Sequence, residues 1–296
     1  MPKVQYSIHC IVAATDFSAN GDLAVMRAAH IAQQHGQALH LLHVVHPLDI
    51  YPELMLTFDA HLKDYERLKK ANGLASLDEL AIKIRKDFDI KVKTATRIGR
   101  THVQIAEYVE SVGADLLVVG FHGEQNVLDA IIGSTAFRLL RLAPCSLLIV
   151  RNGDIVPYQQ VLTAVDFTIG ASAVPRMACA VATTAPIEAL HVFDLKQETL
   201  SRKAGISHTE VQHYRDKATE YAEDTLAKLV AELNEKRISS KVMYGYLPET
   251  ICDRATEINA DLVVLGKKGK SSLQEFVLGS VSKTVASMVS CDVLLT

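Results

Sequence analysis

Short apolar runs alternate with longer amphipathic segments along almost the whole chain. In the first half the apolar runs predict strands at Ser7–Ala14, Ala38–Val45, Lys91–Arg97, Asp115–Val119 and Ser146–Val150. The segments between them predict helices at about Asp22–His35, Asp59–Phe88, Thr101–Val112 and Thr135–Leu142. Apolar runs such as LLVV are continuous rather than alternating, which is typical of strands that are buried on both faces.

The same order of elements occurs twice. The segment IVAATDFSANGDLAVMRAA at 11–29 has a counterpart in VLTAVDFTIGASAVPRMACA at 161–180, and GADLLVVG at 113–120 matches NADLVVLG at 259–266. Because a whole set of strands and helices is repeated, the sequence indicates a tandem duplication.

The halves meet at a connector around RNGDIVPYQQ, which has Gly, Asp and Pro but no apolar periodicity. We therefore expect one domain over residues 1–152 and a second over residues 158–296. Strands that alternate with helices predict a parallel sheet with right-handed crossovers. Each half is expected to be a doubly wound α/β domain with a five-stranded parallel sheet and helices on both faces.

A glycine-rich loop follows a predicted buried strand in each half: GFHGEQNVLDAIIGSTA at 120–136 and GKKGKSSLQEFVLGSVS at 266–282. In the first loop Gly120 ends the strand, Gly123 lies in the turn, and Gly133 and Ser134 open the next helix. Free N–H groups and the dipole at a helix start favour phosphate. We interpret the loop as a phosphate cradle; the alternative is that the glycines serve only chain geometry. The same spacing recurs in Gly266, Gly269, Gly279 and Ser280.

An aspartate ends the first predicted strand of each half, Asp16 in ATDFS and Asp166 in AVDFT. Ligands of doubly wound sheets bind outside the carboxyl ends of the strands, so these carboxylates are candidates for the same cleft. The alternative is a helix N-cap, which Ser18 or Thr168 would also suit. Neither the Walker sequence G-x-x-x-x-G-K-[ST] nor a G-x-G-x-x-G after the first strand is present.

With these motifs the chain resembles the universal stress protein family in its tandem form. The resemblance rests on ATDFS, LLHV, GADLLVVG, APCSLLIV and the two glycine-rich loops, whose spacing matches the family's nucleotide-binding G-x2-G-x9-G-[ST]. It implies an adenine nucleotide α-hydrolase-like fold, with the two halves packed as an internal pseudo-dimer through their last strands, SLLIV and DVLLT. A homodimer of whole chains is left open.

The resemblance also implies roles for individual residues. Asp16 and Asp166 would lie beside adenosine, Val44 and Val192 would offer backbone groups to adenine, and Gly120 and Gly266 would lie near the ribose. The phosphates, with or without Mg²⁺, would be held by Gly123, Gly133 and Ser134 in the first half and by Gly269, Gly279 and Ser280 in the second.

Loop charge distinguishes the two expected ATP sites. Glu124 and Asp129 lie in the first loop and disfavour a triphosphate, whereas Lys267, Lys268 and Lys270 lie in the second and favour it. We expect the second half to bind ATP more tightly, unless those lysines form only a solvated loop.

The function that these observations favour is that of an ATP-binding universal stress protein with a regulatory role in the stress response. One alternative is a slow ATPase. At most weak hydrolysis is expected, because no catalytic residue is identifiable beside the glycines. The other alternative is a nucleotide-free module that binds a protein or lipid partner.

Composition limits the binding partners and the cellular location that we expect. The formal net charge is −3, which gives no reason to expect nucleic acid as a partner. No signal peptide or membrane span is expected, and we expect a cytoplasmic protein. Five cysteines lack any C-x-x-C pair, so no metal site is expected from them. A histidine-rich region at 30–46 leaves metal binding open, although the match of His43 with His191 favours a structural role.

Overall fold

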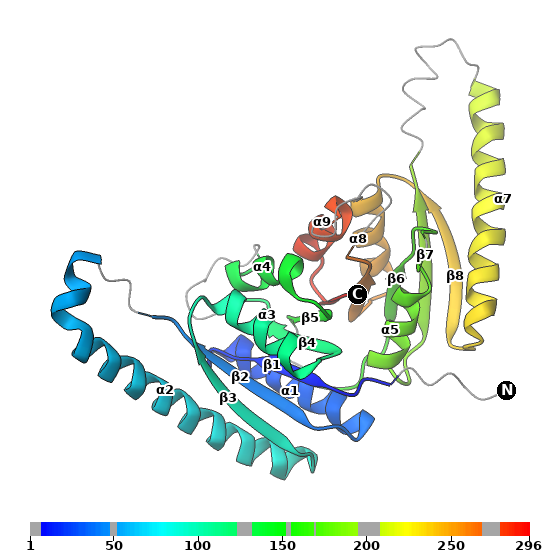
Figure 1. Cartoon of the computed structure of the whole chain (residues 1–296). Coiled ribbons are helices and arrows are strands. Elements are labelled where there is room, and N and C mark those ends of the chain that lie inside the picture. Colours follow the sequence, from blue (N-terminus) through cyan, green and yellow to red (C-terminus); the bar gives the residue numbers. More distant parts are fainter. Residues whose placement is uncertain are drawn as a thin grey trace. The chain divides into compact units, whose positions relative to one another are not determined.

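The computed structural model describes residues 7–47, 52–122, 132–151, 155–168, 170–194, 208–267 and 279–296, with the side chains of 52–63 and His208 outside the description. The described chain divides into two compact units (Figure 1), an N-terminal domain over Ser7–Val156 and a C-terminal domain over Pro157–Thr296.

The N-terminal domain is a parallel sheet with strand order β3-β2-β1-β4-β5. Its elements are β1 (Ile11–Ala14), α1 (Ala19–His35), β2 (Leu39–Val45), α2 (Pro52–Phe88), β3 (Val92–Ile98), α3 (Thr101–Val112), β4 (Leu116–Gly120), α4 (Ser134–Leu142) and β5 (Ser146–Val150). The helix α1 packs against α2, and α3 packs against α4. The predicted doubly wound α/β fold is confirmed.

The C-terminal domain repeats this topology, with strand order β10-β9-β6-β7-β8. Its elements are β6 (Val161–Ala164), α5 (Ala173–Val181), β7 (Ile187–Phe193), α7 (His208–Leu233), β8 (Ile238–Tyr244), α8 (Leu247–Glu257), β9 (Leu262–Leu265), α9 (Ser280–Met288) and β10 (Asp292–Leu295). The strand β6 lies between β7 and β9, as β1 lies between β2 and β4.

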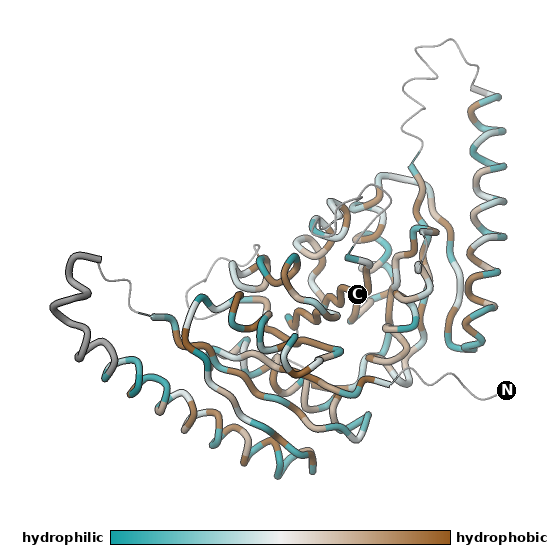
Figure 2. Tube along the Cα trace, in the orientation of Figure 1, coloured by the Kyte–Doolittle hydropathy of each residue, from teal (hydrophilic) through white to brown (hydrophobic). Residues whose placement is uncertain are grey.

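The core of each domain is built from the central strands. Figure 2 shows these strands as mainly hydrophobic, whereas α7 alternates hydrophobic and hydrophilic positions along its length. Ile11, Val12 and Ala13 of β1 are fully buried, and so are Val263 and Val264 of β9. Burial of both sheet faces explains why the strands read as continuous apolar runs.

Several element boundaries differ from the prediction for physical reasons. The strand β1 begins at Ile11 rather than Ser7, because the backbone N–H groups of His9 and Cys10 donate to the Asp115 carboxylate at 2.8 and 3.0 Å. The helix α1 begins at Ala19 rather than Asp22, directly after its cap Ser18. The helix α2 begins at Pro52 rather than Asp59, and proline is well suited to a first helical position.

The first helices of the two domains differ in length. The helix α1 has 17 residues, whereas α5 has 9 and begins only at Ala173. Gly170, with φ of 88°, lies in the turn before α5. The two candidate sites therefore have different backbone beside their first strand.

Candidate functional site

The predicted aspartates and strand-ending glycines lie at one edge of each sheet. In the N-terminal domain Ala14 of β1 pairs with Val119 of β4, so Asp16 and Gly120 follow the ends of neighbouring strands. The pairing of β6 with β9 brings Asp166 and Gly266 together in the same way. Strand order reverses at this point of each sheet, which is where doubly wound domains bind ligands.

The two aspartates are held in identical short turns. Oδ1 of Asp16 accepts hydrogen bonds from the backbone N and Oγ of Ser18 at 3.1 and 2.6 Å. Oδ1 of Asp166 accepts from N and Oγ1 of Thr168 at the same distances. The cap of α1 is Ser18, whose Oγ accepts from the N–H of Gly21 at 3.1 Å. The N-cap alternative for Asp16 is therefore wrong, and its carboxylate is fixed at the strand end instead.

A phenylalanine and a histidine support each of these turns. Phe17 and Phe167 have left-handed φ values of 65° and 58°. Their rings lie on the imidazoles of His43 and His191, whose Nδ1 atoms are 2.9 and 2.7 Å from the carbonyl oxygens of Thr15 and Val165. The sequence analysis assigned no role to these phenylalanines, although the repeated Asp-Phe-[Ser/Thr] was a signal that they matter in both domains.

Two backbone hydrogen bonds bring α4 to the end of β4. The N–H of Phe121, directly after β4, donates to the Val150 carbonyl at 2.9 Å, and the N–H of Gly133 donates to the Phe121 carbonyl at 2.8 Å. As a result α4 begins beside the carboxyl end of β4. The C-terminal domain repeats both bonds, from Lys267 to Thr296 at 2.9 Å and from Gly279 to Lys267 at 3.0 Å.

The glycines that precede α4 and α9 are not required by backbone conformation. Gly133 has φ −53° and ψ 145°, and Gly279 has φ −59° and ψ 137°, values that any residue adopts. A Ser, Thr, Asp or Asn at this N-cap would occupy the first N–H groups of the helix with its own oxygen. Glycine leaves that end without a side-chain cap, and the exposed Ser134 and Ser280 follow it.

Gly120 has a packing role as well. A Cβ at this position would lie 2.6 Å from the backbone oxygen of Asn20 in the first turn of α1. Only glycine lets β4 and α1 approach this closely. Packing therefore requires glycine at this strand end whether or not a ligand is bound.

The remaining predicted residues fall into two groups. Val44 and Val192 occupy the next-to-last positions of β2 and β7, opposite Arg97 and Met243. Gly123 and Gly269 lie outside the described residues, as do Glu124, Asp129, Lys268 and Lys270.

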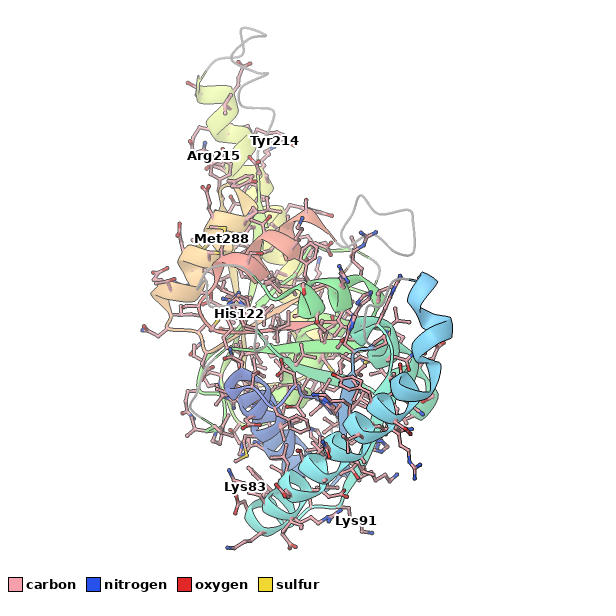
Figure 3. The ribbon with its side chains drawn as sticks, turned by 90° about the vertical axis from the view of Figure 1, so that its left-hand side faces the viewer. Lys83, Lys91, His122, Tyr214, Arg215 and Met288 are labelled. Atoms are coloured by element: carbon pink, nitrogen blue, oxygen red, sulfur yellow. The ribbon has the colours of Figure 1, made fainter. Side chains whose placement is uncertain are left out.

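Charge near the two candidate sites differs. Burial raises the pKa of Asp22 in the first turn of α1, with the negative charge of Asp16 adding to the shift and Lys83 opposing it. At the loop after β4, the Arg151 guanidinium lies over the Phe121 ring, 3.3 Å from its centroid. His122, labelled in Figure 3, is the last described residue of that turn. In the C-terminal domain Lys267 occupies the position of Phe121.

The model of the universal stress protein family matches residues 8–151 and again 157–296. The chain belongs to the universal stress protein family. A universal stress protein of Mycobacterium tuberculosis is 25% identical over 317 aligned positions, which cover 97% of this chain and 96% of the relative. One of Methanocaldococcus jannaschii is 28% identical over 142 residues, covering 48% of this chain and 81% of the relative. The expected family and its tandem form are thus confirmed.

Solved structures share the fold over almost the full length. A universal stress protein from Archaeoglobus fulgidus matches with a TM-score of 0.69 and 19% identity, covering 98% of this chain and 96% of that one. A protein of unknown function from Pseudomonas aeruginosa matches with a TM-score of 0.67 and 20% identity, covering 99% and 94%. At these identities the likeness concerns the fold alone.

The histidines of this universal stress protein make separate local contacts. His40 Nδ1 lies 3.1 Å from the Tyr108 hydroxyl, His30 Nε2 lies 3.0 Å from the Gln34 amide, and His46 Nδ1 lies 2.9 Å from the Pro47 carbonyl oxygen. Within the described ranges, no group of three or more His, Cys, Asp or Glu residues is placed to hold a metal ion. Across the same part of the chain, no helix is both long and apolar enough to span a membrane.

One surface cavity of about 320 Å³ lies in the C-terminal domain, between the turn that precedes α5 and the later turns of α7. It is lined by Thr168, Gly170, Ala171, Ser172, Thr225, Lys228, Leu229 and Glu232. Thr168, the hydrogen-bond donor to Asp166, connects this cavity to the candidate site.

Proposed function

We propose that the chain binds an adenine nucleotide, ATP, in both domains and acts as a nucleotide-responsive regulator in the stress response. The observation that carries the proposal is the pair of uncapped helix starts at Gly133 and Gly279. Both lie beside the end of a central strand, where an aspartate is held by a neighbouring turn. Helix N–H groups that no side chain occupies are suited to phosphate oxygens.

The geometry suggests how the nucleotide would lie. Phosphates at the starts of α4 and α9 would meet Ser134 and Ser280. We propose that Gly123 and Gly269, which lie outside the described residues, and Mg²⁺ also contact these phosphates. The nucleoside would extend along the strand ends toward Asp16 and Asp166, and its base would reach the edge formed by Val44 and Val192.

We propose that the C-terminal domain binds ATP more tightly. Lys267 lies two residues after the end of β9, and its positive charge favours phosphate, whereas Phe121 takes the corresponding place after β4. In the N-terminal domain Asp22 adds a second carboxylate beside Asp16.

The first experiment is mass spectrometry of small molecules released from the purified full chain, followed by calorimetric titration of the nucleotide-free protein with ATP. Gly279→Val and Gly133→Val each add bulk at one helix start without straining the backbone. Ser287→Val, in the last turn of α9, is the control for added bulk. We expect the first two variants to lose one site each, with the larger loss of affinity for Gly279→Val, and the control to keep both sites.

Two results would contradict this proposal. A chain that releases no nucleotide and shows no heat or thermal shift with millimolar ATP does not have the proposed function. Equal losses in the two glycine variants would remove the ranking of the domains while leaving nucleotide binding intact.

A further inference from the structure

Three cationic or titratable side chains gather where α3 and α4 begin in the N-terminal domain. Arg100 directly precedes α3, His102 lies in the first turn of α3, and Arg138 lies one turn into α4. Nη1 of Arg138 is 3.4 Å from Nδ1 of His102. Burial lowers the pKa of His102, and the positive charges of Arg138 and Arg100 lower it further. We call these three residues the basic cluster.

Among the residues that the structure describes, the basic cluster forms no ion pair with an acidic side chain. None of the ion pairs found between described residues involves Arg100 or Arg138, and both side chains are exposed. Both arginines lie close enough to His102 to lower its pKa, and an anion placed beside the two guanidinium groups would be favoured by both charges.

The basic cluster stands next to the uncapped start of α4. Arg138 follows Ser134 by four residues, so the two side chains lie on the same face of the helix. Helical side chains lean toward the N-terminus, which carries the Arg138 guanidinium back over the first turn. A phosphate chain that leaves the helix start across Ser134 would therefore meet Arg138.

The C-terminal domain has uncharged residues at the corresponding positions. Counting from Gly245, the counterpart of Gly99, Tyr246 replaces Arg100 and Pro248 replaces His102. Counting from Ser280, Thr284 replaces Arg138, and its Oγ1 is satisfied by the Ser280 carbonyl at 2.9 Å. The two domains thus differ in charge at a place that only a long anionic ligand reaches.

We propose that the basic cluster binds the outer phosphates of the nucleotide in the N-terminal domain. That domain then distinguishes ATP from AMP through Arg138, a selectivity that the C-terminal domain does not obtain from this position. This inference rests on the proposed nucleotide binding and specifies which feature of the nucleotide one of the two sites recognises.

The test uses the full chain carrying Gly279→Val, which confines binding to the N-terminal domain. Calorimetric dissociation constants for ATP, ADP and AMP are compared before and after Arg138→Thr, which installs the residue found in the C-terminal domain. Loss of a charge-assisted contact should weaken the binding of ATP by about tenfold or more and leave the binding of AMP nearly unchanged. Arg141→Ser, in the last turn of α4, removes the same charge away from the cluster and also installs the C-terminal counterpart. It should leave the ratio of AMP to ATP dissociation constants unaltered.

A reciprocal variant keeps the test independent of any loss of folding. In the Gly133→Val chain, Thr284→Arg should raise the preference of the C-terminal domain for ATP over AMP. The inference is overturned if Arg138→Thr weakens the binding of ATP and AMP equally. It is also overturned if Arg141→Ser changes the ratio of AMP to ATP dissociation constants as much as Arg138→Thr does. A third outcome would assign the cluster to nucleic acid instead. In that case Arg138→Thr weakens the binding of an oligouridylate but leaves the ratio of AMP to ATP dissociation constants unchanged. Failure of the chain without substitutions to bind either nucleotide is a different result, and it removes the proposed function itself.

Discussion

Phe167 and His191 lie nearly parallel, with ring centroids 3.8 Å apart and an interplanar angle of 17°. The phenylalanine reaches this position only by adopting a left-handed backbone, which costs a side-chain-bearing residue about 1–2 kcal/mol. Ring contact and the hydrogen bond between His191 Nδ1 and the Val165 carbonyl offset that cost. Because Asp166 precedes Phe167, the aromatic pair fixes the carboxylate that the candidate site presents.

Replacing this histidine should therefore affect both stability and the site. We expect His191→Ala to lower the free energy of unfolding of the C-terminal domain by about 2–4 kcal/mol, through the lost ring contact and the unsatisfied carbonyl. Urea unfolding followed by circular dichroism measures the change. His213→Ala, at an exposed position of α7, should change the stability by less than about 0.5 kcal/mol. Equal effects of the two substitutions would contradict a supporting role for His191.

The repeated apolar runs were sufficient to predict the order of strands and helices in both halves, because strands buried on both faces leave a strong local signal. The glycine loops could be placed at strand ends for the same reason. The start of α5 was not predicted, although Gly170 is a local signal for the turn that precedes the helix.

Other parts of the site depend on contacts between residues far apart in the sequence. His102 and Arg138 are 36 positions apart, and they meet only because α3 packs on α4. Gly120 could be interpreted as a ligand-facing glycine from sequence, but its proximity to Asn20 depends on the packing of α1 against β4. Distances of this kind are set by tertiary structure and leave no periodic pattern in the chain.

Gly120→Ala tests that second contact. The new methyl group would meet the Asn20 backbone oxygen at 2.6 Å, so β4 and α1 must separate. Overpacking of this kind should lower the unfolding free energy of the N-terminal domain by about 1–3 kcal/mol. Thermal unfolding in the absence of nucleotide measures it. An alanine variant with unchanged stability but weaker ATP binding would instead make Gly120 purely a ligand residue.

Acid should destabilise the N-terminal domain. Burial lowers the pKa of His40, and the charge of Lys93 lowers it further. The folded state therefore favours the neutral form of this imidazole, which contacts the Tyr108 hydroxyl. The unfolded chain, with an ordinary pKa of about 6.5, then binds more protons in the window below that value, and stability falls as the pH decreases. His30 shifts in the same direction, because burial and Arg27 lower its pKa.

The measurement is the unfolding free energy between about pH 7.5 and about pH 5.5, a range in which ordinary carboxylates stay ionised. We expect stability to decrease across this range and the decrease to be smaller in His40→Gln, which keeps a hydrogen-bonding group toward Tyr108 but does not titrate. A slope that is unchanged in this variant would show that His40 is not a source of the acid sensitivity.

The two positions that hold His40 and Tyr108 in the N-terminal domain hold an ion pair in the C-terminal domain. Nε and Nη2 of Arg254 donate to the two carboxylate oxygens of Glu188 at 2.8 and 2.6 Å, and the side chains are only 17% and 12% exposed. Removing one partner of such a pair leaves a largely buried charge, which typically costs about 3–5 kcal/mol. We expect Arg254→Met to lower the free energy of unfolding of the C-terminal domain by nearly that amount, as measured by urea unfolding. A loss under about 1 kcal/mol, as for exposed pairs, would contradict the argument.

The N-terminal domain supplies the matched rescue. In the double variant Glu188→His with Arg254→Tyr, the neutral hydrogen-bonded pair of the N-terminal domain replaces the ion pair at the same two positions. Because no buried charge is left alone, the double variant should recover most of the stability lost in Arg254→Met. It should also become acid-sensitive in the window that His40 defines, since a buried neutral imidazole now opposes protonation. Recovery of stability without this new pH dependence would mean that the two positions tolerate any pair of similar volume, and that the hydrogen bond itself contributes little.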